Sequence, residues 1–524
     1  MQAADRIITA AEMAEIDRLA QERFEIPGML LMENAGQKAW SIVRAQLGAA
    51  EERVHPSRIA FVAGNGNNGG DALVMARQAL IEGDHEVVII TLERDLKGAA
   101  GEQWRILHHL GARRLVWNEH PREASDALDE VAWIVDGIAG TGISGPLRDS
   151  VIPLVERINR SAARVAAVDV PSGLRDGFRP GELAVGADLT VVTGYLKAIL
   201  FENHTRALAG EIRCVDPGFP PVLANDPEVV TTRIARMPRS PHHPVQLSPD
   251  FHKGNKGRVL IVGGSSGTSG AAVLSAEGAV AGGAGMVRAL SSEQGVAAVL
   301  SRNPSIMASE LPASPDAREA SEARAWADVA VLGPGWTSLT DSRLAEWLRA
   351  CGSARTALVL DAAALRTLAL RGEAWEQIMT GSRPMVLTPH VGEWHALSGR
   401  DGLGVRESLE EFPERAGLTI VVKSAVTWVR HSTGEVDVLD GRAPALAVAG
   451  SGDVLSGIIA AALARVLAAG VDTGTGKPEA LRDAVRWALA CHVHAGRELT
   501  LEGRGPSAAD IAARVAAGRE SRHD

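Results

Sequence analysis

Short apolar segments with the composition of buried β-strands recur along this chain, separated by stretches with helical periodicity. In the first half the strand-like segments are 58–63, 86–92, 131–135, 165–168 and 189–193, and in the second half they are 258–262, 329–332, 356–360, 384–387 and 418–422. Strands that alternate with helices form parallel sheets, because each parallel connection needs a crossover and the crossover helices cover both faces. We therefore expect an α/β protein. Thr9 and Glu12 have the spacing of a capping box, which predicts a first helix ahead of these strands.

A proline-rich stretch separates the two sets of strands. The chain has 524 residues, which is too long for one growing core, and eight prolines fall between positions 216 and 249. Prolines at that density disfavour helix interiors and central strands. We predict a first domain over 1–218, a linker over 219–245 and a second domain over 246–524.

Composition excludes several classes of protein. Hydrophobic residues make up 46% of the chain and charged residues 23%, as in globular proteins. Aromatic residues are only 4%, so the stacking platforms of single-stranded nucleic-acid binding proteins are not expected. The formal net charge is −10, which disfavours a polyanion-binding surface. We expect no nucleic-acid partner.

The spacing of the cysteines and the hydropathy of the chain predict its cellular location. Cys214, Cys351 and Cys491 lie far apart, which predicts neither a disulfide framework nor a zinc site and is typical of a reducing cytoplasm. The N-terminal residues are polar and charged and lack the pattern of a signal peptide. The longest apolar stretch, 454–464, is too short to span a bilayer. We expect a cytoplasmic protein with no membrane partner.

The first glycine cluster, residues 64–69, matches G-x-G-x-x-G between a strand and a helix predicted over 72–82. This is the spacing of a dinucleotide-binding turn, although a tight turn without a ligand gives the same pattern. Asn67, Asn68 and Asp71 place amide and carboxylate oxygens where a pyrophosphate would need only N–H donors. Such oxygens suit a hard cation or the hydroxyl groups of a ligand.

Two other strand ends carry similar chemistry. Asp136 precedes the glycine-rich segment 140–146, and Asp169 precedes Ser172. Each of these turns alone is explained by a helix cap. Because ligands collect at the carboxyl ends of strands in open α/β sheets, we predict that the three turns converge on one site.

Together these segments resemble the NAD(P)H-hydrate epimerase family over about residues 1–215. The motifs in order are 31–36 (Leu-Met-Glu-Asn-Ala-Gly), 64–71, Asp136 with 140–142, and 168–173. The resemblance implies a Rossmann-like three-layer domain that interconverts the R and S epimers of hydrated NADH and NADPH. It implies hydrate contacts at Asn67, Asn68, Gly69, Gly70, Asp71, Gly140, Thr141, Gly142, Ile143, Ser144, Gly145, Pro146 and Asp169, and a potassium ion on Asn68, Asp136 and Ser172.

Epimerisation at a ring carbon that bears a hydroxyl needs a group that shuttles protons near neutrality. Asp169 is our candidate for this catalytic acid/base. Lys197 is a second candidate, with a solvated surface lysine as the alternative. The family usually has glycine where this chain has Ala72, a change that would narrow the turn.

In the second half, residues 450–457 (Gly-Ser-Gly-Asp-Val-Leu-Ser-Gly) place glycines at the start of a long apolar helix. Free N–H groups and the helix dipole favour an anion there. Asp453 would oppose simple phosphate binding, but it could accept a hydroxyl proton while the amides stabilise a transferring phosphoryl group. A glycine-rich turn capped by aspartate is the alternative. No Gly-Lys-Ser/Thr follows, so the segment is not a P-loop.

The segment 388–395 contains His390, Glu393 and His395 in a His-x-x-Glu-x-His pattern. His395 would fall away from the other two on a helix, and Pro389 and Gly392 oppose an uninterrupted helix, which disfavours zinc. We interpret His390 as a substrate contact at a strand end, with a helix cap as the alternative.

The second half resembles the ribokinase-like fold and, more narrowly, the NAD(P)H-hydrate dehydratase family over about residues 245–515. The motifs are 252–254, 267–271, 283–285, 333–335, 388–393, 423–427, 450–453, 494–496 and 508–510. The family phosphorylates the ring hydroxyl of the S hydrate from ADP or ATP and then eliminates phosphate. The resemblance implies an α/β/α domain that uses Mg²⁺ and ADP, with ATP as the alternative donor.

The same resemblance assigns residues to the second site. It implies that Asp453 is catalytic and that the hydrate contacts Ala271, Gly335, His390 and Asp453. It implies that ADP and AMP contact Lys423, Ser424, Ala425, Val426, Thr427 and Gly452. Two departures bear on this activity, since Ala363 stands where the family often has aspartate and Thr337 replaces a third glycine.

The leading hypothesis is thus a bifunctional isomerase and lyase that repairs hydrated NADH and NADPH as a homo-oligomer. A vitamin or sugar kinase fused to a nucleotide-binding module is the alternative, because the Gly-Ser-Gly-Asp turn is shared across that fold. A non-catalytic first domain is a third reading. An NAD-dependent dehydrogenase is the weakest, because no catalytic pattern accompanies its glycines.

Overall fold

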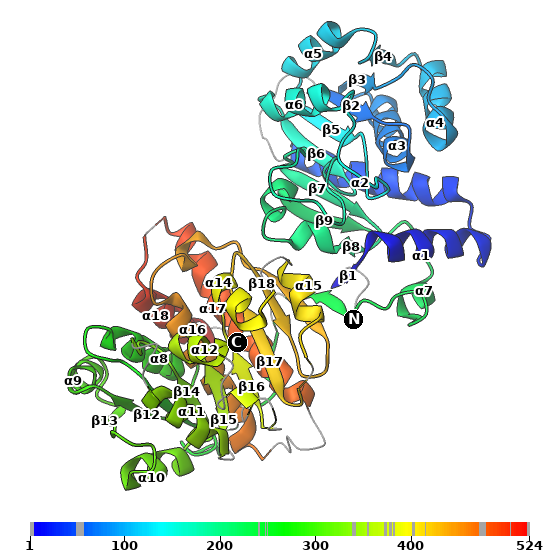
Figure 1. Cartoon of the computed structure of the whole chain (residues 1–524). Coiled ribbons are helices and arrows are strands. Elements are labelled where there is room, and N and C mark those ends of the chain that lie inside the picture. Colours follow the sequence, from blue (N-terminus) through cyan, green and yellow to red (C-terminus); the bar gives the residue numbers. More distant parts are fainter. Residues whose placement is uncertain are drawn as a thin grey trace. The chain divides into compact units, whose positions relative to one another are not determined.

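The computed structural model describes residues 5–48, 57–238, 241–246, 248, 250–337, 342–353, 356–370, 375–376, 380, 383–400, 404–413, 415–470, 478–503 and 505–520. The chain divides into two compact units, Met1–Ala235 and Arg236–Asp524 (Figure 1). Each unit is built on a mainly parallel sheet covered by helices, so the predicted α/β class is confirmed.

The first unit contains a seven-stranded parallel sheet with strand order β4-β3-β2-β5-β6-β7-β9. The strands are β2 (Arg58–Ala63), β3 (Glu86–Thr91), β4 (Arg113–Val116), β5 (Trp133–Gly137), β6 (Arg164–Val168), β7 (Leu189–Thr193) and β9 (Glu211–Val215). The chain runs outward from β2 in one direction and from β5 in the other. The sheet therefore has its topological switch point between β2 and β5, where α/β proteins bind ligands.

Alternating residues of the central strand β2 reach opposite layers of the first unit. Phe61 packs with α2 (Gly28–Gly48), α3 (Asn67–Glu82) and α4 (Gly98–His109). Ala60 and Val62 pack with α5 (Pro121–Asp129) and α6 (Ile152–Arg160) on the other face. All three strand residues are fully buried, as the two-residue period of a strand covered on both faces requires.

The N-terminal helix α1 (Ala10–Glu22) begins with the predicted capping box, in which Thr9 accepts from the Glu12 amide and Glu12 accepts from the Thr9 amide. Its apolar face packs against residues of the proline-rich stretch, including Phe219 and Leu223. Three short strands accompany it: β1 (Arg6–Ile8) pairs with β8 (Leu196–Lys197) and with β10 (Ile234–Arg236).

The predicted linker over 219–245 therefore differs from the structure. Residues 219–235 belong to the first unit and include the helix α7 (Pro221–Asn225). The prolines stand at the start of that helix and in turns, where proline is tolerated, and the apolar residues between them are buried. Residues 239 and 240 of the predicted linker lie outside the described residues.

The second unit contains the strand order β13-β12-β11-β14-β15-β16-β17-β18-β19. Its parallel strands are β11 (Arg258–Val262), β12 (Met286–Ser291), β13 (Met307–Glu310), β14 (Val329–Leu332), β15 (Ala357–Leu360), β16 (Met385–Leu387) and β17 (Leu418–Val422). Two antiparallel strands, β18 (Val426–Arg430) and β19 (Val436–Asp440), extend the sheet. Neither antiparallel strand was predicted from the sequence.

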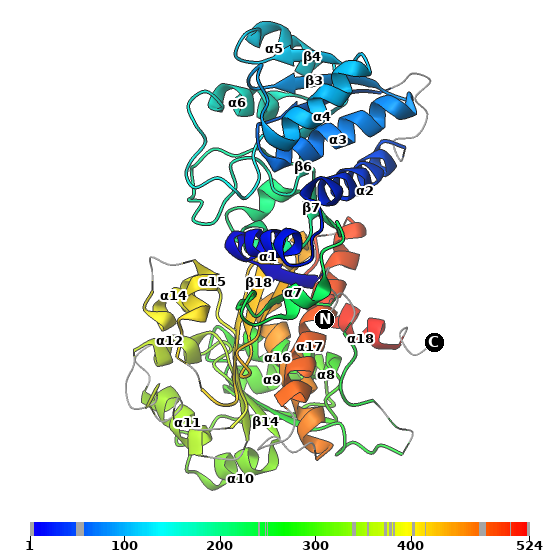
Figure 2. The same cartoon turned by 90° about the vertical axis from the view of Figure 1, so that its right-hand side faces the viewer.

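Helices cover both faces of this sheet, which makes three layers (Figure 2). One layer contains α8 (Ser269–Ala281), α9 (Glu293–Arg302), α16 (Ser451–Ala468), α17 (Pro478–Leu501) and α18 (Ala508–Glu520). The other contains α10 (Arg318–Trp326), α11 (Ser342–Ser353), α12 (Ala363–Ala369), α14 (Val391–Ser398) and α15 (Val405–Glu410).

The helix α16 is long and apolar enough to cross a membrane by composition alone, yet 78% of it is buried inside the structure. It packs against α8 and α17 in the main core of the second unit. An all-round apolar helix in that position is the central helix of a core. Its first residue follows the Gly-rich turn, as predicted.

Candidate active sites

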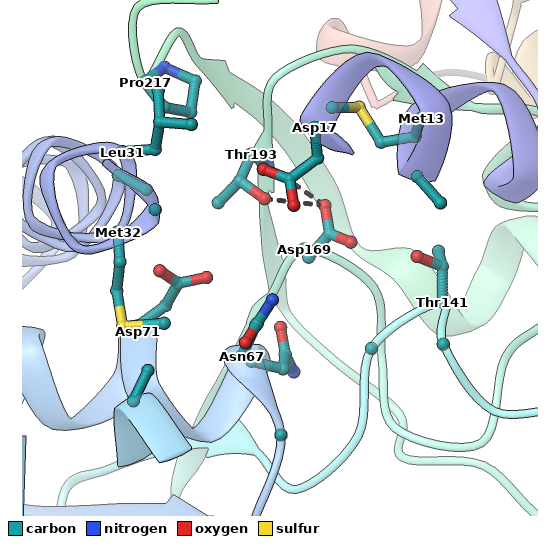
Figure 3. Close-up of a pocket in the computed structure, with 18 of the residues that line it drawn as sticks. Met13, Asp17, Leu31, Met32, Asn67, Asp71, Thr141, Asp169, Thr193 and Pro217 are labelled. Carbon is teal, nitrogen blue, oxygen red and sulfur yellow. Dashed lines mark hydrogen bonds between the residues drawn. The ribbon is translucent and has the colours of Figure 1, made fainter. Parts of the chain in front are cut away.

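A cavity of about 930 Å³ opens at the carboxyl ends of the strands beside the switch point of the first unit (Figure 3). Its lining includes the predicted residues Asn67, Asn68, Asp71, Gly140, Thr141, Gly142, Ile143, Ser144 and Asp169. The three polar turns of the first domain do therefore converge. Gly69, Gly70, Gly145 and Pro146 are not among the residues that line it.

Gly69 and Gly70 serve close packing in the first turns of α3. A Cβ on Gly69 would lie 2.0 Å from the Gly64 carbonyl oxygen, and a Cβ on Gly70 would lie 2.5 Å from the Met32 Cε atom. The helix begins at Asn67, five residues before the predicted start, and no side chain caps it at Gly66. Its first amides are therefore open to the cavity.

Asp169 lies in a strained position at the end of β6, and its Oδ1 atom has several hydrogen-bond partners. Its φ of 64° lies in the left-handed region, which is rare for a residue other than glycine and common at functional sites. Its Oδ1 accepts from the Thr193 amide at 3.2 Å and from the Thr193 hydroxyl at 3.1 Å. The Lys197 ammonium contacts the same oxygen and donates to the Thr193 carbonyl at 2.7 Å.

Lys197 is 1% exposed, so the alternative of a solvated surface lysine is wrong. Both candidates for the acid/base group thus lie in one buried ion pair that lines the cavity. A buried ammonium this close to a carboxylate fixes the carboxylate in place and keeps the local charge near zero.

Asp71 provides a second carboxyl group on the cavity wall, one turn into α3. It is 8% exposed, and no hydrogen bond to its carboxyl group occurs among the described residues. Burial raises the pKa of Asp71 well above its usual value, and the nearby Asp169 charge raises it further. A raised pKa favours the protonated form of the carboxyl group, which can donate a hydrogen bond.

Asp136, Ser172 and Asn68 lie together beneath the cavity. Asp136 accepts from the Ser172 hydroxyl at 2.6 Å and from the Ser172 amide at 2.8 Å. Burial raises the pKa of Asp136 to about 6. The Nδ2 atom of Asn68 is buried and has no partner within the described part of the chain. This set of side-chain oxygens around a fully buried carboxyl group suits a hard cation.

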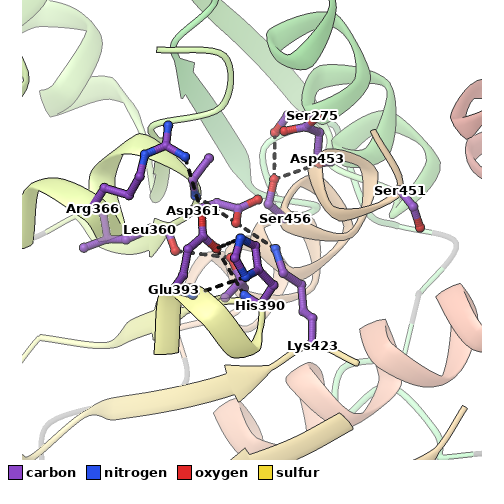
Figure 4. A network of polar contacts seen from close by, with 12 residues as sticks. Ser275, Leu360, Asp361, Arg366, His390, Glu393, Lys423, Ser451, Asp453 and Ser456 are labelled. Atoms are coloured by element: carbon purple, nitrogen blue, oxygen red, sulfur yellow. Dashed lines mark hydrogen bonds and ion pairs between the residues drawn. The ribbon is translucent and has the colours of Figure 1, made fainter. Parts of the chain in front are cut away.

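The second unit assembles a charged cluster at the carboxyl ends of β15, β16 and β17 (Figure 4). The Lys423 ammonium lies 2.8 Å from Oδ1 of Asp361, which is 3% exposed. A parallel bridge between His390 and Lys423 places those two residues side by side. Gly452, at the start of α16, lies close to the same ammonium group, because a Cβ atom added to it would be 3.1 Å from the Lys423 Nζ atom.

Asp453 lies in the first turn of α16 and meets this cluster. Burial and the nearby carboxylates of Asp361 and Glu393 together raise its pKa to about 7, against the opposing effect of the Lys423 ammonium. Gly450 begins the helix with a φ of 89°, and no side chain caps the helix at that residue. A carboxyl group with a pKa near neutrality beside free helix amides is equipped to accept a proton next to a bound anion.

His390 caps α14 and remains accessible. Its Nδ1 accepts from the Glu393 amide at 3.2 Å, and Glu393 accepts from the His390 amide at 3.1 Å. Its side chain is 62% exposed. The capping alternative is therefore correct for Nδ1, while the exposed ring remains next to Lys423 and is free to meet a substrate.

The remaining predicted residues of the second site fall into two places. Ala271 and Gly335 are neighbours, because a Cβ on Gly335 would lie 3.0 Å from the Ala271 Cβ. The segment 423–427 turns from β17 into β18. Ala425 is exposed at the turn, whereas the side chains of Val426 and Thr427 are buried in the sheet and can offer a nucleotide only their backbone.

Two family models match the chain: YjeF-related protein N-terminus over residues 29–199 and NAD(P)H-hydrate dehydratase over residues 259–511. The bifunctional NAD(P)H-hydrate repair enzyme Nnr of Moorella thermoacetica is 34% identical over 495 residues, which cover 90% of each chain. The chain belongs to the bifunctional NAD(P)H-hydrate repair enzyme family. The relative from Thermanaerovibrio acidaminovorans is 33% identical over 94% of each chain, and that from Escherichia coli is 31% identical over 86% of this chain and 84% of its own.

A solved structure is also similar to the second unit. The ADP/ATP-dependent NAD(P)H-hydrate dehydratase of Bacillus subtilis, co-crystallised with ATP and Mg²⁺, is 23% identical. It covers 53% of this chain and 94% of its own, with a TM-score of 0.41.

Departures from the usual repair-enzyme pattern fall on packed positions. Ala363, which replaces an aspartate, is 1% exposed in the first turn of α12. Trp336 precedes the position of the missing third glycine and is 3% exposed. Asp361, the carboxylate that this chain retains, is the one that pairs with Lys423.

Sequence reasoning missed Asp17 as a lining residue of the first cavity. It lies on α1, outside the matched family model, and no motif surrounds it. The available signal was helical periodicity: Met13, Asp17 and Gln21 are four residues apart and share one face.

Proposed function

We propose that this enzyme repairs hydrated NADH and NADPH by two activities, an epimerase in the first unit and a nucleotide-dependent dehydratase in the second. The observation that supports the proposal is that each unit of this chain places, among its predicted site residues, a carboxyl group that we assign as its acid/base. These are Asp169 on the cavity and Asp453 at the start of α16.

In the epimerase, the hydrate would lie in the cavity against the first amides of α3 and the loop 140–146. Asp169 and Lys197 exchange the proton that the ring hydroxyl needs when it leaves as water and when water returns to the opposite face. The close ion pair holds the acid/base group in one position, which is worth roughly 10²–10⁴-fold in rate.

Asn68, Asp136 and Ser172 would hold K⁺ beneath this cavity. When bound, the ion supplies positive charge next to a buried carboxyl group. That charge would favour the ionised form of Asp136, whose pKa burial raises to about 6 against the opposing hydrogen bonds from Ser172. The ionised carboxylate accepts from the Ser172 amide and hydroxyl and so fixes the turn that follows Asp169.

In the dehydratase, Asp453 accepts the proton of the ring hydroxyl while that oxygen attacks the terminal phosphoryl group of ADP. The P–O bond to AMP breaks, and the hydrate carries the phosphate. Elimination of that phosphate then regenerates the reduced nicotinamide, so the products are AMP, phosphate and NAD(P)H. Phosphate is expelled far more readily than hydroxide, which is why a phosphoryl-transfer site can perform a dehydration.

The other residues of the second site would bind the two substrates. His390, Ala271 and Gly335 contact the hydrate, and Gly452 with the segment 423–427 contacts ADP. Mg²⁺, when bound, neutralises charge on the transferring phosphate. We also propose a cytoplasmic location, small-molecule substrates alone, and a homo-oligomeric state. The domain limits become 1–235 and 236–524, in place of a separate linker.

The test uses the full chain with mixed R and S hydrates, ADP and Mg²⁺, followed by the absorbance of the reduced nicotinamide. Both epimers should be restored, and ATP in place of ADP identifies the preferred donor. Recovery of the S epimer alone would remove the epimerase from the proposal. Accumulation of a stable phosphorylated vitamin or sugar with ATP would instead identify a kinase.

A further inference from the structure

The N-terminal helix α1 forms one wall of the epimerase cavity. Ala10, Met13, Ala14, Asp17 and Gln21 lie on one helical face and all line the cavity. The matched family model begins at residue 29 and does not include this helix.

Asp17 is the only charged residue on that face of α1. Figure 3 shows its carboxylate pointing toward Asp169 and Thr193. Its Oδ2 accepts from the Gln21 amide group at 3.0 Å, and Oδ1 has no hydrogen-bond partner among the described residues. Burial raises the pKa of Asp17, so the group is partly withdrawn from bulk water even before a ligand arrives.

The charges around the cavity limit what can lie against Asp17. The described lining contains four acidic residues, Asp17, Asp71, Glu102 and Asp169, and one basic residue, Lys197. Lys197 is already engaged by Asp169 and by the Thr193 carbonyl. A phosphate beside Asp17 would meet a like charge with no cationic side chain to offset it. A neutral group that donates a hydrogen bond would instead meet an available acceptor.

We propose that Asp17 is a further substrate-contacting residue of the epimerase, and that it accepts a hydrogen bond from the uncharged, hydroxyl- or carboxamide-bearing half of the hydrate. The inference rests on the proposed epimerase function and deepens it. The hydrated nicotinamide riboside portion occupies the cavity next to α1, and the phosphates of the dinucleotide lie away from it.

The test compares Asp17→Asn with wild type on two substrates, the hydrate of NADH and the hydrate of reduced nicotinamide riboside, which has no phosphate. Loss of one charge-assisted acceptor should raise KM about tenfold for both substrates, because both present the same neutral half. The change in kcat should be smaller, since Asp169 and Lys197 remain in place.

Glu15→Gln is the matched control, because Glu15 lies on the same helix outside the cavity lining and pairs with Arg18. It should leave both KM values unchanged. Thermal unfolding of the same preparations, followed by circular dichroism, reports whether each variant is folded.

Three outcomes would overturn the inference. A lower KM for the NADH hydrate with no change for the riboside hydrate would place a phosphate beside Asp17. Unchanged KM values for both would remove Asp17 from the site. A riboside hydrate that is neither epimerised nor inhibitory would show that the neutral half alone does not occupy the cavity. Failure of wild type to epimerise the NADH hydrate would instead reject the proposed function.

Discussion

Lys423 and Asp361 form an ion pair of 2.8 Å at the centre of the second site, next to the carboxyl group of Asp453. Asp361 directly follows β15 and Lys423 directly follows β17, so the pair joins the ends of two strands that are not neighbours in the sheet. Because Lys423 pairs with Asp361, the carboxyl group of Asp453 is the one of the two that is not bound to a cation and can exchange a proton.

The first prediction concerns the pH dependence of dehydration. The base form of Asp453 is required, and burial together with the nearby carboxylates raises its pKa to about 7. The rate with the S hydrate and ADP should therefore fall as the pH drops below about 7 and level off above it. Asp453→Asn should lower the rate roughly 10²–10⁴-fold on the plateau above about pH 7 and narrow the gap to wild type at lower pH. Thermal unfolding of the variant is the control for folding, and a wild-type rate that rises toward acid pH would contradict the assignment.

The second prediction concerns Lys423. Its ammonium lowers the pKa of Asp453, so Lys423→Met should move the acid limb of the dehydration profile to higher pH. The single variant leaves Asp361 buried and unpaired, which costs stability on the order of 3–5 kcal/mol. The double variant Asp361→Asn, Lys423→Met removes both charges and should recover much of that loss in denaturant titrations. Equal stability of the single and double variants would argue against a paired role.

The third prediction separates the two activities. Asp169→Asn should lower conversion of the R hydrate roughly 10²–10⁴-fold, because it removes the acid/base carboxylate and the partner of Lys197. Dehydration of pure S hydrate should continue at the wild-type rate. If R-hydrate conversion persists unchanged in this variant, the first unit is a binding module or uses another group.

The fourth prediction concerns K⁺ and Asp136. Its pKa in the folded chain, about 6, lies above the usual 3.8, so protonation favours folding. The stabilisation of the folded chain by protonated Asp136 is complete below pH 3.8 and is lost as the pH rises through about 6. K⁺ should therefore raise Tm well above pH 6 and have little effect well below it.

The matched variant for this prediction is Asp136→Asn, which has no carboxylate to ionise. Its Tm should not respond to K⁺ and should depend less on pH between 3.8 and about 6 than that of wild type. Choline chloride serves as the salt control for wild type. An equal rise in Tm with choline and K⁺ would mean that ionic strength, not a bound ion, is responsible.

Periodicity and turn chemistry were sufficient to predict most of the parallel strands and the first helix cap. Segments 58–63 and 258–262 coincide with β2 and β11, and Thr9 and Glu12 form the predicted capping box. These features depend on residues close in the chain. The strands β18 and β19 were missed because the sequence around 423–427 resembles a nucleotide-binding turn, and antiparallel pairing depends on a partner strand.

The proline-rich stretch shows where local rules fail. The density of prolines predicts that residues 219–235 form no long helix or central strand. It does not predict whether their side chains are buried against the rest of the domain. Phe219, Leu223 and Val230 bury their side chains against α1, so the stretch belongs to the first unit. Whether a segment is buried depends on the part of the fold that packs against it, and the composition of the segment does not identify that partner.

By itself the sequence determined that the chain has two α/β halves, that polar turns follow their strands, and that Asp136, Asp169 and Asp453 stand at those turns. Local residue order fixes those features. Only the tertiary structure decided that Lys197 is buried against Asp169, that Lys423 pairs with Asp361, and that Asp17 faces the cavity. Each of these relationships joins segments that are distant in the chain, and their burial and mutual charge hold the charged groups in the positions on which the proposed chemistry depends.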